Sequence, residues 1–182
     1  IVYMKTLEGG ALSVAKIRTA LKQSYNKDKF KISIDGYEFN QKLSNREAQV
    51  YNNPTTNHSI VVHRGSQGFN DYMTDAAYIT TGYKGDRFKN SSKVQRDAEN
   101  LYGSQNVSTV GHSLGSWLSS DVGKNSKEII NLNKPYAPFA RKRDNEINIR
   151  TKSDPFSFSL PTEDDKNKTI NKSYWNPLIT TA

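Results

Sequence analysis

Residues 106–120 have the sequence NVSTVGHSLGSWLSS. Its first part, 106–110, is rich in β-branched residues and predicts a strand, and 116–120 suits a short helix. Between them, residues 111–115 match the pattern Gly-x-Ser-x-Gly. At a strand-to-helix turn the two glycines let the backbone turn sharply and project the Ser113 hydroxyl above the strand ends, while the Leu114 N–H lies at the helix N-terminus where an oxyanion would form. The stretch therefore predicts an activated serine.

The segments around this turn alternate between strand and helix patterns. A sheet built this way is mostly parallel and has helices on both faces, so we expect a three-layer α/β sandwich. The strands are predicted at about 59–63, 106–110, 128–132 and 146–150, and the helices at about 70–79, 90–102 and 116–120.

The N-terminal part has a different pattern. Apolar residues at helical spacing predict an amphipathic helix over about 10–25. Alternating apolar residues flank Asp35-Gly36, a pair that accepts the positive φ angles of a two-residue hairpin turn. A second antiparallel pair, about 49–51 and 59–63, flanks a turn-rich segment.

Length and composition limit the domain organisation. The 182 residues suffice for one domain, and we expect a single α/β unit over 1–161. Residues 162–182 are polar and weakly patterned and are predicted to be an extended tail. The first residue is Ile1 and not Met, so we expect a processed or incompletely observed form. We also expect the tail to continue past Ala182.

Composition also excludes several classes of site. The absence of cysteine rules out disulfides and thiolate metal ligands, and three scattered histidines form no metal-ligand spacing. The net charge of +8 favours anionic surfaces, but no motif or aromatic-interleaved basic stripe points to nucleic acid. No apolar run approaches the roughly 18 residues of a membrane span. We expect a soluble or peripheral protein that needs no metal and no cofactor.

Three motifs in order carry a family resemblance. They are Val61-Val62-His63-Arg64-Gly65-Ser66, then Asp71-Tyr72-Met73-Thr74-Asp75, then Val110-Gly111-His112-Ser113-Leu114-Gly115. The chain resembles the class 3 (fungal-type) lipase family of α/β-hydrolases over roughly 45–161. In its short length, high Asn and Lys content and terminal tail, it looks most like short virus-encoded members.

The resemblance implies roles for single residues. Ser113 would be the nucleophile, Ser66 and the Leu114 N–H would form the oxyanion hole, and Asp154, which precedes Pro155, would be the triad carboxylate. The implied reaction is hydrolysis of an acylglycerol or phospholipid ester through an acyl-serine intermediate. Weaker candidates for the carboxylate are Asp144, Asp164 and Asp165.

The general base is missing from this pattern. In this fold the order is Ser, Asp, His, and no histidine follows Ser113. His58 is expected to be solvated, His63 to be a packed strand residue, and His112 to project away from the serine hydroxyl. Three explanations stay open: a base beyond Ala182, loss of the base with retention of the fold, or recruitment of His63.

A candidate lid or interfacial segment lies between the oxyanion loop and the Ser113 turn. Two aromatic residues lie among three basic ones there, a mixture suited to an anionic lipid surface: Tyr83, Lys84, Arg87, Phe88 and Lys89. A solvated charged loop is the other interpretation. The expected partner is a lipid or phospholipid at a membrane surface. The alternative function is an inactive lipase-fold module that binds a membrane or an assembly partner, such as virion or capsid proteins.

Overall fold

The computed structural model describes residues 12–26, 31, 33–66, 81–82, 84–135, 143–151 and 167–170. The helix predicted over about 70–79 lies outside these ranges, as do Tyr83, Asp154, Asp164 and Asp165. No helix within the described ranges is both long enough and apolar enough to cross a lipid bilayer.

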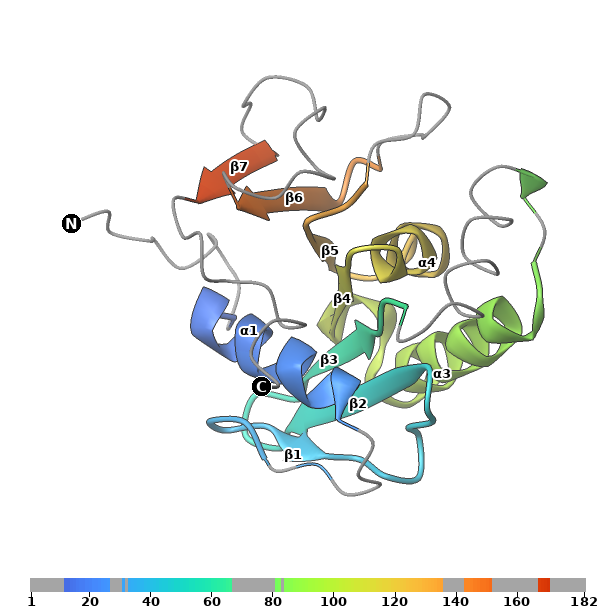
Figure 1. The fold of residues 1–182 in the computed structure, drawn as a ribbon. Helices are drawn as coiled ribbons and strands as arrows, with labels where there is room; N and C mark the ends of the chain where they lie inside the picture. Colours follow the sequence, from blue (N-terminus) through green and yellow to red (C-terminus); the bar gives the residue numbers. More distant parts are fainter. Residues whose placement is uncertain are drawn as a thin grey trace.

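A seven-stranded sheet forms the centre of the structure, with its strands in chain order from one edge to the other (Figure 1). The first three pair antiparallel, and all pairs from β3 to β7 are parallel. The expectation of a mostly parallel sheet is confirmed. Since parallel strands point the same way, the C-terminal ends of β3, β4, β5 and β6 lie on the same side of the sheet. The strands are β1 (Glu38–Phe39), β2 (Ala48–Asn53), β3 (His58–His63), β4 (Val107–His112), β5 (Glu128–Leu132), β6 (Glu146–Thr151) and β7 (Asn167–Ile170).

Helices cover both faces of the sheet, which confirms the three-layer sandwich. Figure 1 shows α1 (Val14–Tyr25) on one side of the strands and α3 (Asp86–Tyr102) on the other, with α4 (Gly115–Val122) beside β4. The helix α1 begins at Ser13, whose side chain accepts a hydrogen bond from the Lys16 N–H. A short 3₁₀ turn, Ser104–Asn106, connects α3 to β4.

Strand alternation divides the apolar core between the two faces. Along β3, Ile60 and Val62 pack towards α1, while Val61 packs towards α3 with Val94 and Ala98. Side chains of successive strand residues point to opposite faces, so β3 is apolar on both. This strand therefore contributes to both apolar clusters.

The predicted turn at Asp35-Gly36 is present. Ile34 and Tyr37 exchange backbone hydrogen bonds across it, and Gly36 has φ +78°. The following residues, β1, pair with β2. The predicted antiparallel pair of β2 and β3 is also confirmed, in a register that places Ala48 opposite His63.

The segment predicted to be a tail contributes a strand. Residues 167–170 pair in parallel with β6, with Asn148 opposite Asn167. The sequence of β7, Asn-Lys-Thr-Ile, lacks the apolar alternation that indicates a strand. Its place at the sheet edge explains this, because edge strands often carry lysine and polar residues that discourage further pairing.

The sheet face beside α4 has a polar interior. Lys134 is buried there, with its Nζ 2.5 Å from Glu146 Oε1 and 2.7 Å from Ser120 Oγ. Asn131 Nδ2 donates to the same carboxylate oxygen at 3.0 Å. Burial lowers the pKa of Lys134, and the charge of Glu146 acts against that shift.

Candidate active site

Ser113 occupies the turn between β4 and α4 with a strained backbone. Its φ is +52°, a left-handed conformation that is uncommon for a residue with a side chain. The Ser113 N–H donates to Leu132 O at 3.0 Å, and the Ser116 N–H donates to Ser113 O at 2.9 Å. These bonds join the turn to the end of β5 and to the first turn of α4. Strain of this kind costs about 1–3 kcal/mol and is common at functional sites.

The two glycines of the motif are required by close approaches of backbone. A Cβ on Gly111 would lie 2.7 Å from Ser116 Cα, so α4 packs directly on the strand. A Cβ on Gly115 would lie 2.6 Å from Arg64 O and 2.7 Å from His63 O. The first contact fits the sharp turn expected from the sequence. The second was not expected: Gly115 lets the loop after β3 lie against the start of α4.

Leu114 stands where an oxyanion donor is required. It is the N-cap residue of α4 and has helical backbone angles. Within the part of the chain that the structure describes, its N–H makes no hydrogen bond. An open N–H at a helix N-terminus favours an anion. The oxyanion role of Leu114 stays a prediction, and its position agrees with it.

The loop 64–66 follows β3 and lies against the Ser113 turn. A Cβ on Gly65 would lie 2.8 Å from His112 O, which shows how closely the two segments approach. The Gly65 N–H donates to the Tyr25 hydroxyl at 3.1 Å. Ser66, the predicted second oxyanion residue, is half-buried at the end of this loop. The fold thus brings together the two segments that the sequence assigned to one site.

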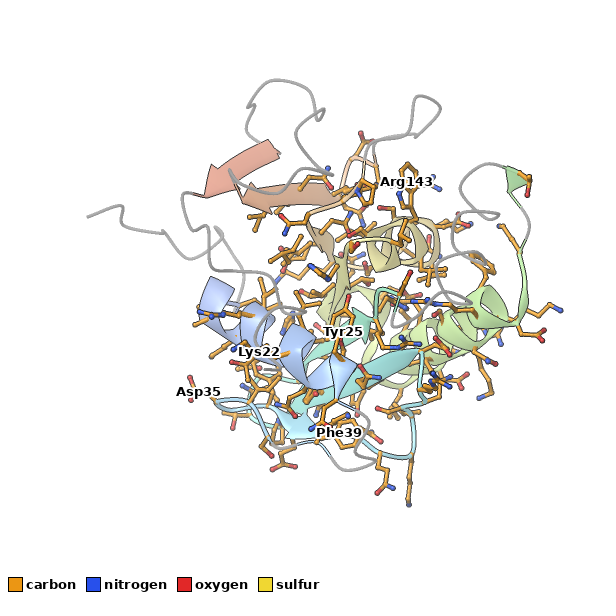
Figure 2. The ribbon with its side chains drawn as sticks, viewed as in Figure 1. Lys22, Tyr25, Asp35, Phe39 and Arg143 are labelled. Atoms are coloured by element: carbon orange, nitrogen blue, oxygen red, sulfur yellow. The ribbon has the colours of Figure 1, made fainter. Side chains whose placement is uncertain are left out.

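Tyr25 links these two segments to helix α1. Besides accepting the Gly65 N–H, its hydroxyl lies 2.7 Å from His112 Nδ1, and the two rings meet edge to face. Figure 2 shows Tyr25 at the last turn of α1. The sequence analysis missed this residue, because a tyrosine at the end of an amphipathic helix gives no local sign of a distant partner.

The histidines beside the site are both buried. His112 is hydrogen-bonded to Tyr25, as above, and His63 Nε2 lies 3.0 Å from Gln95 Oε1 on α3. Burial lowers the pKa of each to about 4. His63 is a packed strand residue, as expected, and its complete burial against α3 argues against its recruitment as a base.

The expectation for His58 was wrong. Its side chain is buried, with Nδ1 2.7 Å from the Tyr37 hydroxyl and Nε2 2.8 Å from Ser108 Oγ. Burial is the main cause that lowers its pKa to about 4, and the charge of Lys127 adds to it. The turn-rich sequence before His58 suggested solvent, but the residue itself begins β3 and points into the structure.

The candidate carboxylates fall mostly outside the described residues. Asp154, Asp164 and Asp165 do so, and Asp144 is exposed in the turn before β6. Within the described ranges, no group of three or more histidine, aspartate or glutamate side chains could hold a metal ion.

The candidate lid residues that the structure describes, which exclude Tyr83, differ in exposure. Lys84 Nζ lies 3.1 Å from Asp121 Oδ2 and 4.5 Å from the centre of the Phe88 ring. Lys89 is exposed, 3.6 Å from Asp86. Arg87, by contrast, is only 7% exposed and donates to Arg64 O. The expectation that Arg87 faces a lipid surface is therefore corrected, because its guanidinium is part of the interior.

Glu47, Arg64 and Arg87 form a buried charged cluster that the sequence analysis missed. Arg64 Nη2 donates to Glu47 Oε2 at 3.0 Å, and Arg87 Nε lies 3.4 Å from the same oxygen. The contact between Glu47 and Arg64 follows from strand pairing, because the β2–β3 register that places Ala48 opposite His63 also places Glu47 beside Arg64. Arg87 lies on α3, and no strand pairing indicates its contact with Glu47.

Comparisons with solved structures bear on the fold. A fungal lipase–inhibitor complex, described as a model for interfacial activation in lipases, matches with a TM-score of 0.51 and 16% identity, over 75% of this chain and 68% of the other. The Rhizomucor miehei lipase–propeptide complex matches with a TM-score of 0.52 and 16% identity, over 81% of this chain and 62% of the other. No family model matches the chain, and no curated protein does.

These matches establish the fold. The chain has an α/β-hydrolase-like architecture of the fungal-lipase type, as the resemblance implied. It spans less than two thirds of the Rhizomucor miehei lipase chain. At 16% identity the likeness concerns the fold, and chemistry has to be argued from the site.

Proposed function

We propose that this chain is a lipase-like serine ester hydrolase that acts on acylglycerols or phospholipids through an acyl-Ser113 intermediate. The observation that carries the proposal is the left-handed φ of +52° at Ser113, between a parallel strand and a helix in a lipase-type fold. This is the geometry that exposes a nucleophile above the strand ends. Leu114 directly follows Ser113 in this turn, and the loop ending at Ser66 packs closely against the same turn.

In the proposed reaction, Ser113 Oγ attacks the ester carbonyl and its proton passes to a base. The carbonyl oxygen becomes an oxyanion, which the Leu114 N–H and Ser66 would stabilise. Collapse of the tetrahedral intermediate expels the alcohol, which takes up the proton, and water then hydrolyses the acyl-serine by the same route. Asp154 would orient the base. None of the three histidines of the chain is free for this role.

That last observation favours a second candidate. His58, His63 and His112 are all buried and hydrogen-bonded within the fold, as residues with structural roles are. The second candidate is a non-catalytic lipase-fold module that binds a membrane or an assembly partner, such as another component of a virus particle. An unassisted serine is a weak nucleophile, so such a module should have almost no activity.

Labelling with a fluorophosphonate decides between the two. The full polypeptide is treated with the reagent, digested and mapped by mass spectrometry, with Ser113→Ala as the negative variant and Ser33→Ala, at an exposed serine, as a matched control. The enzyme proposal expects one label, on Ser113, and hydrolysis of a short-chain ester that disappears with Ser113→Ala alone. Absence of labelling and of hydrolysis in the folded protein contradicts the enzyme proposal and favours the binding module.

A further inference from the structure

The side chains of Glu47, Arg64 and Arg87 pack against the loop 64–66, of which Arg64 is the first residue. Its members come from three places in the chain: the residue before β2, the residue after β3 and the first turn of α3. Arg64 is 1% exposed, Arg87 7%, and the Glu47 side chain 15%. Both guanidinium groups share one oxygen, Glu47 Oε2.

Both arginines bond to the backbone of this loop. Arg87 Nη2 donates to Arg64 O, and Arg64 Nη1 donates to Gly65 O at 3.1 Å. The Arg64 N–H in turn donates to Glu47 O at 3.1 Å. Two consecutive peptide carbonyls are thus held by charged donors, and hydrogen bonds from charged donors are about twice as strong as neutral ones.

Fixing these carbonyls also fixes the N–H groups of the same peptide units. The described residues contain no cis peptide, so each N–H points away from the carbonyl of its own unit. The carbonyl of Gly65 faces the Arg64 guanidinium, and the Ser66 N–H therefore faces the other way. A cation on the carbonyl also polarises the peptide, which makes its N–H a stronger donor.

The Arg64–Ser66 loop also packs closely against the Ser113 turn. The start of α4 leaves no room for a side chain at Gly115, because Arg64 O and His63 O are too close. A shift of the loop would therefore change its position relative to Ser113. Stability alone gives a weak reason for such a cluster, since a buried ion pair often stabilises no more than apolar residues of the same volume.

We propose that Glu47 and Arg87 are positioning residues that hold the Arg64–Ser66 loop against the Ser113 turn and so fix where Ser66 lies relative to the oxyanion. This inference rests on the proposed function. Neither residue touches substrate: Arg87 acts through the carbonyl of Arg64, and Glu47 acts by holding both guanidinium groups in place.

The test compares Arg87→Gln, Arg87→Lys and Glu47→Gln in the full polypeptide. Lys93→Gln is the control, because Lys93 lies on the same helix, is exposed and, among the described residues, pairs only with Asp97. Each variant is assayed for hydrolysis of a short-chain ester, for unfolding in urea, and for amide hydrogen exchange of the 60–66 segment. Arg87→Lys keeps the charge and loses the forked geometry of the guanidinium.

We expect Arg87→Gln and Glu47→Gln to lower kcat by about tenfold or more while KM changes by less than about threefold, since direct removal of an oxyanion donor costs about 10²–10³-fold. Arg87→Lys should recover part of the loss, exchange at 64–66 should accelerate, and Lys93→Gln should match the wild type. Values of kcat within twofold of wild type, or a loss that only follows the unfolded fraction, would overturn the inference.

The exchange measurement separates the inference from the proposed function. If the wild-type protein does not hydrolyse esters, the proposed function fails, and exchange still reports whether the cluster holds the loop. Unchanged exchange at 64–66 in all three variants overturns the inference whether or not the protein is active. If a glutamine variant does not fold, Arg87→Lys provides both readouts.

Discussion

Acidification should destabilise this protein steeply between about pH 6.5 and pH 4, because all three of its histidines are buried. Burial lowers the pKa of His58, His63 and His112 to about 4 in the folded chain. In the unfolded chain a histidine has a pKa of about 6.5. Between these values the unfolded chain binds more protons, so the free energy of unfolding falls as the pH falls.

The expected loss can be worked out from these pKa values. For one histidine, lowering the pH from 7 to 5 reduces the free energy of unfolding by roughly 2 kcal/mol. Three independent histidines give roughly 5 kcal/mol, which is comparable to the total stability of many domains, about 5–15 kcal/mol. Burial raises the pKa of Glu99, and this acts in the opposite direction because a carboxyl with a raised pKa favours the folded state as the pH falls.

Urea unfolding followed by circular dichroism at pH 7, 6 and 5 measures this loss. The variant His58→Gln removes one titrating group and keeps an amide able to bond to Tyr37 and Ser108. It should start less stable at pH 7, yet lose only about two thirds as much on acidification. A free energy of unfolding that changes by less than about 1 kcal/mol from pH 7 to pH 5 would refute the reasoning.

Three further predictions concern packing, buried charge and lipid contact. Gly115→Ala should reduce the free energy of unfolding by about 2 kcal/mol or more in urea titrations, because its Cβ would lie 2.6 Å from the neighbouring backbone. Lys134→Met should cost about 3–5 kcal/mol by leaving the Glu146 carboxylate buried without its cation, and adding Glu146→Leu should restore much of this. The double variant Lys84→Glu, Lys89→Glu should weaken sedimentation with phosphatidylglycerol vesicles, since both lysines are exposed.

Each of these three has a contrary outcome. A Gly115→Ala protein as stable as wild type would mean that the loop after β3 is not wedged against α4. If Lys134→Met costs under about 1 kcal/mol, the pair with Glu146 is not a desolvated one. Vesicle binding that is unchanged by the Lys84 and Lys89 reversals, while lost in high salt, would place the lipid contact elsewhere on the basic surface.

The features that sequence alone predicted are those with a local cause. The strand before Gly111, the turn at Ser113 and the helix after it follow from β-branched alternation and from two glycines at fixed spacing. The turn at Asp35-Gly36 follows from the positive φ that glycine accepts. In each case neighbouring residues along the chain determine the conformation.

The features that sequence did not predict depend on partners far along the chain. His58 and Arg87 carry polar side chains that normally face solvent, and each is buried because distant elements supply its hydrogen bonds. The strand β7 is polar, and only pairing with β6 makes it a strand. The pairing of Glu47 with Arg64 could have been inferred from the β2–β3 register once that hairpin was predicted.

The left-handed backbone at Ser113 has a consequence for stability as well as for chemistry. A side chain at a φ of +52° lowers the stability of the folded state, and glycine adopts this φ without that penalty. Ser113→Gly should therefore make the protein more stable by on the order of 1 kcal/mol while it deletes the hydroxyl. This is the reverse of the usual effect of glycine, and it means that a fold used only for binding would gain by giving up the serine that this chain retains.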